Sequence, residues 1–249
     1  MEPSAGGPSP GEESAMHVRE VGAAAGVSVA LVKFYVREGL LHPGIRESVN
    51  TTTYDETHVA RLRLIRALVE GGRLPLAAVG ELLEAIDDAT LPVEVVAHDA
   101  HRAVSRLEHP PSDEAVSLVL DAIARQGWQV SEDNPGVLQC ASVVDTAMGV
   151  GQAGFEEMLT LYAEPAELIA RQDLAALSLA PAERSRVAET IVLGTVLGDA
   201  MLLGMRRIAQ EHLARTTMLL ADLQAEGRVP PQRPQSPRDD EGRPAVEAS

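Results

Sequence analysis

Cationic and hydroxyl side chains gather in one short segment near the N-terminus of the chain. Lys33 is the only lysine in 249 residues, and Arg37 follows it after about one helical turn. An ammonium or guanidinium group binds a phosphate oxygen or a guanine edge, and a hydroxyl also binds phosphate. This segment is therefore a candidate nucleic-acid contact; the alternatives are that Lys33 is only a solvated surface residue and Tyr35 a half-buried core aromatic. The candidate contacts are Ser28, Ala30, Leu31, Lys33, Tyr35 and Arg37.

Two helices joined by a tight turn are predicted to position this segment. Residues 18–25 favour a short helix, Gly26 a turn, and Ser28 the N-cap of a second helix that ends near Glu38, before Gly39. In a helix-turn-helix, the second helix fits the major groove of B-DNA and presents side chains from its N-terminal part to the bases.

Residues 40–53 favour a hairpin or irregular loop, which would form a wing. Pro43, Gly44 and Asn50 are turn residues, and the neighbouring Val and Thr residues favour strands. A wing would bring Arg46 and Asn50 to the phosphates or the minor groove. The three threonines at 51–53 could add hydroxyl contacts, which bind phosphate more weakly than cations do.

Two further helices are expected to complete a small domain of residues 16–88. The third begins near Thr53 or Asp55, where Thr53 and Glu56 have the spacing of a capping box, and the fourth follows Pro75. The third helix carries arginines that could flank the phosphate backbone, although a charged series more often forms a solvated helix face. These residues are Arg61, Arg63 and Arg66.

Several linked motifs run through this domain, namely Gly26-Val27-Ser28, Lys33-Phe34-Tyr35, Arg37-Glu38-Gly39-Leu40-Leu41, Tyr54-Asp55-Glu56 and Arg61-Leu62-Arg63-Leu64-Ile65. In this combination the domain resembles the N-terminal winged helix-turn-helix domain of the MerR family. The resemblance implies a dimer that binds and distorts promoter DNA, with Tyr35, Arg37 and Tyr54 among the DNA contacts. Phe34 stands where the family usually has tyrosine, and it is expected to pack because it cannot donate a hydrogen bond.

Residues 91–226 are predicted to form an all-helical domain for dimerisation and effector binding. Breaks are expected at Pro165 and Pro181 among others, with two helices between Pro181 and Glu226. The segments YAEPAELIARQDL and ETIVLGTVLGDAMLLGMRRIAQEHL resemble helices of TetR-type ligand-binding domains. Aromatic and thioether side chains here could line an apolar effector pocket or simply form a core. The candidate pocket residues are Trp128, Met148, Phe155, Met158, Tyr162, Met201 and Met205.

Composition narrows the remaining possibilities. The net charge of −16 repels nucleic acid, so any DNA binding must be local.

Cys140 is the only cysteine and the His98–His101 pair has no evident third ligand, so neither a metal nor another cofactor is expected. The chain shows no signal peptide and no unbroken apolar stretch of about 18 residues, which predicts a cytoplasmic protein without a membrane partner. Residues 1–15 and 227–249 are rich in polar and turn-forming residues and are expected to be a disordered leader and tail.

The sequence as a whole favours a mainly α-helical transcriptional regulator. We expect a homodimer on double-stranded promoter DNA, with RNA polymerase as an indirect partner and a small apolar molecule as effector. The alternative is a ligand-sequestering protein that keeps the same fold. An enzyme is disfavoured, because the sequence shows no phosphate-binding loop, nucleophile elbow or metal triad.

Overall fold

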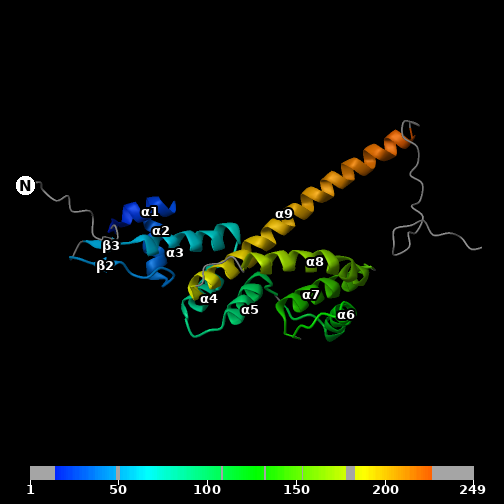
Figure 1. Cartoon of the computed structure of the whole chain (residues 1–249), viewed down its shortest axis with the longest axis horizontal. Helices are drawn as coiled ribbons and strands as arrows, with labels where there is room; N and C mark the ends of the chain where they lie inside the picture. The colour runs from blue at the N-terminus through cyan, green and yellow to red at the C-terminus, as the bar shows by residue number, and fades with distance from the viewer. Residues whose placement is uncertain are drawn as a thin grey trace, which may run out of the picture. The chain divides into compact units, whose positions relative to one another are not determined.

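The computed structural model describes residues 15–48, 51–107, 109–131, 133–152, 154–177 and 183–225 (Figure 1). The described part is mainly helical, as predicted. The chain divides into two compact units, the first ending at Ala200 and the second beginning at Met201. The predicted leader and tail lie outside the described residues, apart from Ala15.

The predicted helix-turn-helix is present at the N-terminal end of the first unit. Helix α1 spans Val18–Ala25 and helix α2 spans Val29–Arg37. Gly26 joins them with φ of 69°, a left-handed conformation that favours glycine. The Ser28 hydroxyl accepts a hydrogen bond from the Leu31 N–H at 3.2 Å, which confirms Ser28 as the N-cap of α2.

The wing is a small antiparallel sheet with the strand order β1-β3-β2. Strand β2 spans Ile45–Arg46 and β3 spans Thr52–Tyr54, so the expected hairpin is confirmed. The short strand β1, Met16–His17, was not predicted from the sequence; it pairs with the outer side of β3 and places Met16 opposite Tyr54. The sheet thereby ties the start of α1 to the wing.

Helix α3 spans Glu56–Arg66 and continues as the π-helical turn η1, Ala67–Gly71. Its N-cap is Asp55, whose carboxylate accepts hydrogen bonds from the N–H groups of Thr57 (3.0 Å) and His58 (3.3 Å). The predicted capping box of Thr53 and Glu56 is wrong, because Thr53 lies in β3 and its hydroxyl donates to the Ile45 carbonyl at 3.3 Å.

One hydrophobic core joins the winged helix-turn-helix to later helices of the same unit. Helix α4 spans Leu76–Asp87, α5 spans Val93–Val104, and α9 begins at Arg184. Buried residues of α5 and of the first part of α9 belong to the same core as α1 to α4. From these two helices they are Val96, Ala100, Ala103, Ala188, Val192 and Val196. The core therefore crosses residues 88–91, where the domain boundary was predicted.

A second, smaller core lies among α6 (Asp113–Arg125), α7 (Pro135–Gly149) and α8 (Phe155–Leu177). The predicted break at Pro165 is wrong, since Pro165 lies inside α8. Proline removes one helical N–H, but the surrounding Ala, Glu and Leu residues are strong helix formers. Pro181 lies outside the described residues, and from Arg184 to Ala225 the structure shows one helix, α9, instead of two.

Candidate nucleic-acid interface

The outer face of α2 is the part of the described domain that best fits a groove of DNA. Ala30, Lys33 and Arg37 are exposed at spacings of three and four residues, while Val32 is buried in the core behind them. Residues three and four apart lie on the same side of a helix. The structure therefore brings Ala30, Lys33 and Arg37 to one surface, as a recognition helix requires, and it leaves Leu31 half-buried beside them.

Arg37 lies at the C-terminal end of this face. Its side chain is 71% exposed and pairs with Glu38 through a 3.1 Å hydrogen bond from Nε. Its guanidinium carbon lies 5.2 Å from the centre of the Phe34 ring, a cation–π arrangement. Phe34 also packs against the core, as predicted, so its ring contributes to the position of Arg37.

Tyr35 is a core residue, so the predicted phosphate contact is not supported. It is only 3% exposed, and its ring packs against that of Phe34 with centroids 5.7 Å apart. Burial, and to a smaller extent the Glu70 carboxylate, raises the pKa of Tyr35. The position of Tyr35 on the inner side of α2 explains the result, since Val32 precedes it by three residues and is buried as well.

The wing presents fewer polar groups than the sequence suggested. Arg46 is exposed and its Nε donates to the Ser48 carbonyl at 3.2 Å, so it remains a candidate contact, whereas Asn50 lies outside the described residues. Thr53 is buried, and its hydroxyl is bonded within the hairpin. Tyr54 is only 9% exposed, which does not support the predicted DNA contact, because its ring lies edge-on against His58 in the core.

The arginines of α3 hold the domain together. The Arg61 side chain is 14% exposed, and its guanidinium donates to the Leu40 carbonyl (3.1 Å) and, through two nitrogens, to the Asp87 carboxylate. It joins the turn after α2 to the end of α4, so its predicted role at phosphate is not supported. Arg63 remains exposed, but it donates to the Ala24 carbonyl at 3.0 Å.

Arg66 completes this arrangement, a structural role that was not predicted from the sequence. Its Nη1 donates to the Ala25 carbonyl at 3.0 Å, and its other nitrogens pair with Glu70. Arg63 and Arg66 therefore bind the last carbonyls of α1, which have no helical N–H partner. One sequence signal for these contacts was available. Gly26 predicts the end of α1, and the last carbonyls of a helix need donors from elsewhere, which arginine side chains can supply.

The predicted effector-pocket residues differ in their surroundings. Phe155 lines a cavity of about 310 Å³ on the first unit, together with Val143 and Val150. The Trp128 indole donates to Glu167 of α8 at 3.3 Å, and Met158 is half-buried. The remaining four side chains are exposed by between 40% and 69%, and two of them belong to the second unit. These four are Met148, Tyr162, Met201 and Met205.

A larger and more polar cavity of about 720 Å³ lies among α4, α5 and α7. It was not predicted from the sequence, because its lining comes from three separate helices and the loop after α5. The lining residues are Glu81, Arg102, Ala103, Ser105, Arg106, Leu107, Pro135 and Leu138.

The exposed α2, the turn before it and the three-stranded wing define a winged helix-turn-helix domain. Residues 16–86 match the model of the MerR HTH family regulatory proteins. This domain of the chain therefore belongs to the MerR family.

Two further similarities agree with this assignment. Over 76 residues the chain is 38% identical to the HTH-type transcriptional regulator MerD of Acinetobacter calcoaceticus, a match that covers 30% of this chain and 62% of MerD. The chain thus spans less than two thirds of the length of that relative. The crystal structure of SCO5550 from Streptomyces coelicolor A3(2), a proposed transcriptional regulator, has a TM-score of 0.59 with 30% sequence identity, covering 80% of this chain and 97% of SCO5550.

Proposed function

We propose that this protein is a transcriptional regulator that binds promoter DNA as a homodimer, with α2 in the major groove. The observation that carries the proposal is the exposed face of α2, which presents Ala30, Lys33 and Arg37 together within a MerR-family domain. An ammonium and a guanidinium on one helix face suit phosphate and guanine contacts. Ser28 and Ala30 lie at the start of α2, where a recognition helix contacts bases.

The charge of the chain supports the need for two copies. Acidic residues outnumber basic ones in the whole chain, and three of the basic residues in the small domain, Arg61, Arg63 and Arg66, are bonded to protein groups. Lys33, Arg37 and Arg46 are the exposed cations of α2 and β2, and the last two also bond to their neighbours Glu38 and Ser48. A few phosphate contacts per copy give weak, salt-sensitive binding, and a dimer doubles their number.

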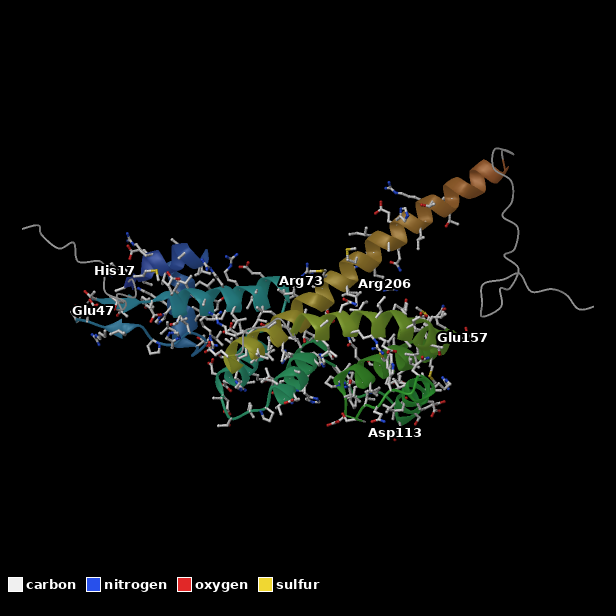
Figure 2. All side chains as sticks on the ribbon, in the orientation of Figure 1. His17, Glu47, Arg73, Asp113, Glu157 and Arg206 are labelled. Atoms are coloured by element: carbon white, nitrogen blue, oxygen red, sulfur yellow. The ribbon has the colours of Figure 1, made fainter. Side chains whose placement is uncertain are left out.

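Helix α9 supplies an apolar surface for the proposed dimer. Met201, Met205 and Ile208 follow one side of the helix and are 69%, 57% and 63% exposed. Figure 2 shows side chains projecting from α9 before and after Arg206 along the helix. Burying a large aliphatic side chain stabilises by about 1.5–3 kcal/mol. Pairing of α9 with the same helix of a second copy would bury these side chains and so stabilise a dimer.

Residues 184–218 of α9 are also long and apolar enough to cross a membrane, by length and composition alone. The sequence had been expected to contain no such segment. Charged residues such as Glu189 and Asp199 interrupt the apolar run, but the mean hydropathy of its most apolar window is 1.6. Buried Val192 and Val196 pack this same helix into the core of the first unit. That packing favours a helix of a folded domain, and dimerisation in solution is the outcome we expect.

An apolar effector completes the proposal. The cavity beside Phe155 has a volume of about 310 Å³, near the lower end of the range for small-molecule sites, about 300–1,000 Å³. Its lining combines the apolar residues Val143, Ala147, Val150 and Phe155 with the polar residues Ser142, Thr146 and Gln152. An effector that binds here would contact α7 and α8, the helices of the second core.

DNA binding as a function of salt tests the central part of the proposal. Fluorescence anisotropy with a labelled fragment of the protein's own promoter should give an affinity that falls as salt rises. Arg37→Gln should weaken binding and reduce the salt slope by about one for each phosphate that is no longer neutralised, or about two for a dimer. Lys33→Gln should act in the same direction.

Arg171→Gln is the matched control for Arg37→Gln. Arg171 is 72% exposed and pairs with a neighbouring glutamate, as Arg37 does, but it lies on α8. The control should leave the affinity and the salt slope unchanged. Binding that is independent of salt, or an equal decrease in both variants, would contradict the proposed interface.

A further inference from the structure

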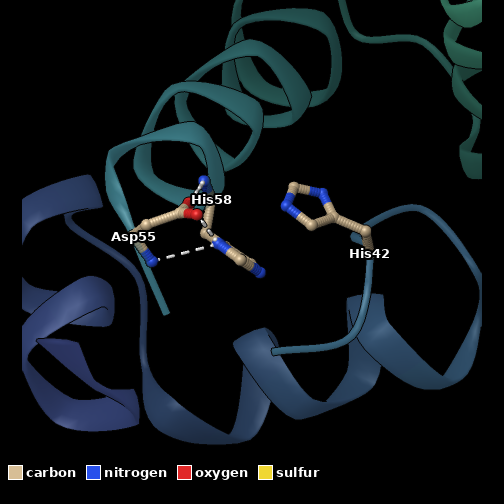
Figure 3. Close-up of side chains that lie close together, drawn as sticks. All are labelled: His42, Asp55 and His58. Carbon is tan, nitrogen blue, oxygen red and sulfur yellow. Dashed lines mark hydrogen bonds and ion pairs between the residues drawn. The ribbon is translucent and has the colours of Figure 1, made fainter. Parts of the chain in front are cut away.

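Two histidines and an aspartate converge at the root of the wing (Figure 3). His42 lies in the loop after α2, whereas Asp55 and His58 lie at the start of α3. One potential ligand atom from each of the three side chains lies within 4.8 Å of the other two. The imidazole rings of His42 and His58 are 3.8 Å apart at their centres.

His58 is held with one ring nitrogen unused. It is only 3% exposed, and its Nδ1 lies 2.7 Å from Oδ1 of Asp55. The backbone N–H of Asp55 also points at Nδ1, 3.1 Å away. That N–H can donate to Nδ1 only when Nδ1 carries no proton, whereas the contact with Oδ1 needs a proton on Nδ1, so the two contacts belong to the two tautomers of the ring. The Thr57 hydroxyl, together with the bonds from His58, holds the pKa of Asp55 well below its ordinary value. The opposite nitrogen, Nε2, is buried and has no hydrogen-bond partner.

An unpartnered buried nitrogen is unusual in a folded protein and needs an explanation. In the tautomer whose Nδ1 donates to Asp55, His58 Nε2 carries a free lone pair, and an ion bound at Nε2 would select that tautomer. A carboxylate that binds the far side of a histidine ring is the arrangement that orients metal-binding histidines. The geometry of Asp55 and His58 is therefore that of a histidine prepared to bind a cation.

His42 offers the second nitrogen. Its residue is exposed, and its Nε2 lies 3.1 Å from the Thr57 hydroxyl, on the side facing Asp55 and His58 (Figure 3). Because the Thr57 hydroxyl donates to Asp55, Nε2 of His42 is the donor in its contact with Thr57 and would pass that proton to Nδ1 or to solvent when an ion binds. A rotation of this exposed ring would exchange the Thr57 contact for a bond to an ion.

We propose that His42 and His58 bind a divalent transition-metal ion such as Zn²⁺ through their Nε2 atoms, with Asp55 as the positioning residue that orients His58. Imidazole nitrogen suits zinc and its neighbours in the series better than it suits Mg²⁺ or Ca²⁺. Nitrogens bound to one tetrahedral zinc ion at ~2.1 Å are ~3.4 Å apart, and the exposed His42 ring is the one that would rotate to bring its Nε2 to that distance from Nε2 of His58. Solvent would complete the coordination from the exposed side of His42.

The position of this site has a structural consequence. His42 belongs to the loop that leads from α2 to the wing, and His58 belongs to the first turn of α3. A bound ion would tie these two segments together. The proposal does not rest on DNA binding, and its test measures metal binding alone.

The test is a titration of the full chain, first stripped of metal by a chelator, with Zn²⁺ in competition with a chromophoric chelator. Titration with Co²⁺ provides a second readout, the visible absorption of the bound ion. We expect one ion per chain and a higher thermal midpoint in its presence. His42→Ala removes an exposed ligand and should lower the affinity at least tenfold. Asp55→Asn keeps a good helix N-cap and should lower the affinity about 10–100-fold.

His98→Gln/His101→Gln is the control, because these two histidines lie three residues apart on α5, away from the wing. This double variant should bind the ion as the unmodified chain does. The proposal is overturned if the unmodified chain binds no ion, if His42→Ala binds it equally well, or if the control loses binding. Thermal melting without metal would show whether each variant is folded.

Discussion

Replacing Gly72 by alanine tests whether the first part of α9 packs on the winged helix-turn-helix as the shared core indicates. Gly72 follows η1 with φ of −82° and ψ of −14°, values that alanine adopts readily. A Cβ at this position would overlap Cγ1 of Val196 and lie 2.9 Å from the Leu68 carbonyl oxygen. Valine in a helix has one strongly preferred rotamer, so Val196 cannot easily turn aside.

The expected magnitude follows from this overlap. Overpacking a core by one methyl group costs about 1–3 kcal/mol. The thermal midpoint should therefore fall by about 2–4 °C for each kcal/mol in a chain of this size. Chemical denaturation at a fixed protein concentration measures the change in the free energy of unfolding. Gly80→Ala is the control, because its Cβ would meet the flexible end of Leu40 at an ordinary 3.4 Å, and it should stabilise by up to about 1 kcal/mol.

A double variant makes the reasoning refutable. Val196→Ala alone should cost about 1–3 kcal/mol by loss of buried methyl groups. In Gly72→Ala/Val196→Ala, the new methyl group would lie 3.5 Å from Cβ of residue 196, an ordinary contact. The double variant should be more stable than the sum of the single effects by about 1–2 kcal/mol. Additive effects would refute the packing of α9 against Gly72.

Three further predictions test the roles given to other residues. Arg61→Met should lower the free energy of unfolding by about 2 kcal/mol in denaturant, because it removes a charged donor from the partly buried Leu40 carbonyl; no change would contradict its structural role. Tyr35→Phe should leave the anisotropy-measured DNA affinity unchanged, because the side chain is buried, and a tenfold loss would restore the predicted phosphate contact. Met205→Glu should shift the protein from dimer to monomer in sedimentation, whereas Gln210→Glu, on the opposite side of α9, should not; equal effects would argue against a dimer through the Met205 face.

The helix-turn-helix could be predicted from sequence because its signals are local. Gly26, Ser28 and Gly39 each impose a conformation on their own residue or turn, and the structure places all three as expected. Pro165 shows the limit of such signals. A single proline removes one hydrogen bond, and a long run of helix-forming residues outweighs it.

The contacts of the arginines could not be predicted, because they depend on packing between distant segments. Arg61 meets Leu40 and Asp87, which are separated from it by 21 and 26 residues. From sequence alone, a guanidinium that binds a phosphate and one that binds a carbonyl look the same. The amphipathic pattern of α2 could have placed Tyr35 inside, since Val32 and Tyr35 share a side of the helix.

The histidine cluster could not be predicted for a related reason. Sequence spacing singles out His98 and His101, which lie on one helix and have no evident third ligand. His42 and His58 are 16 positions apart and have no periodic relation, so only the fold of the wing root brings them together. One part of the cluster is local in sequence: Asp55 caps the first turn of α3 and also contacts the ring of His58, three residues later.

The core shared between the winged helix-turn-helix and α9 limits how freely this protein can be recombined. A chimera that joined residues 16–88 to a foreign sensor domain would lack Ala188, Val192 and Val196 of the core. Gly72 would then lack Val196, the side chain that packs against it. The transplanted winged helix-turn-helix domain would then be less stable and more prone to aggregate. A functional graft would carry α5 and the first turns of α9 with it, so the exchangeable unit is discontinuous in sequence.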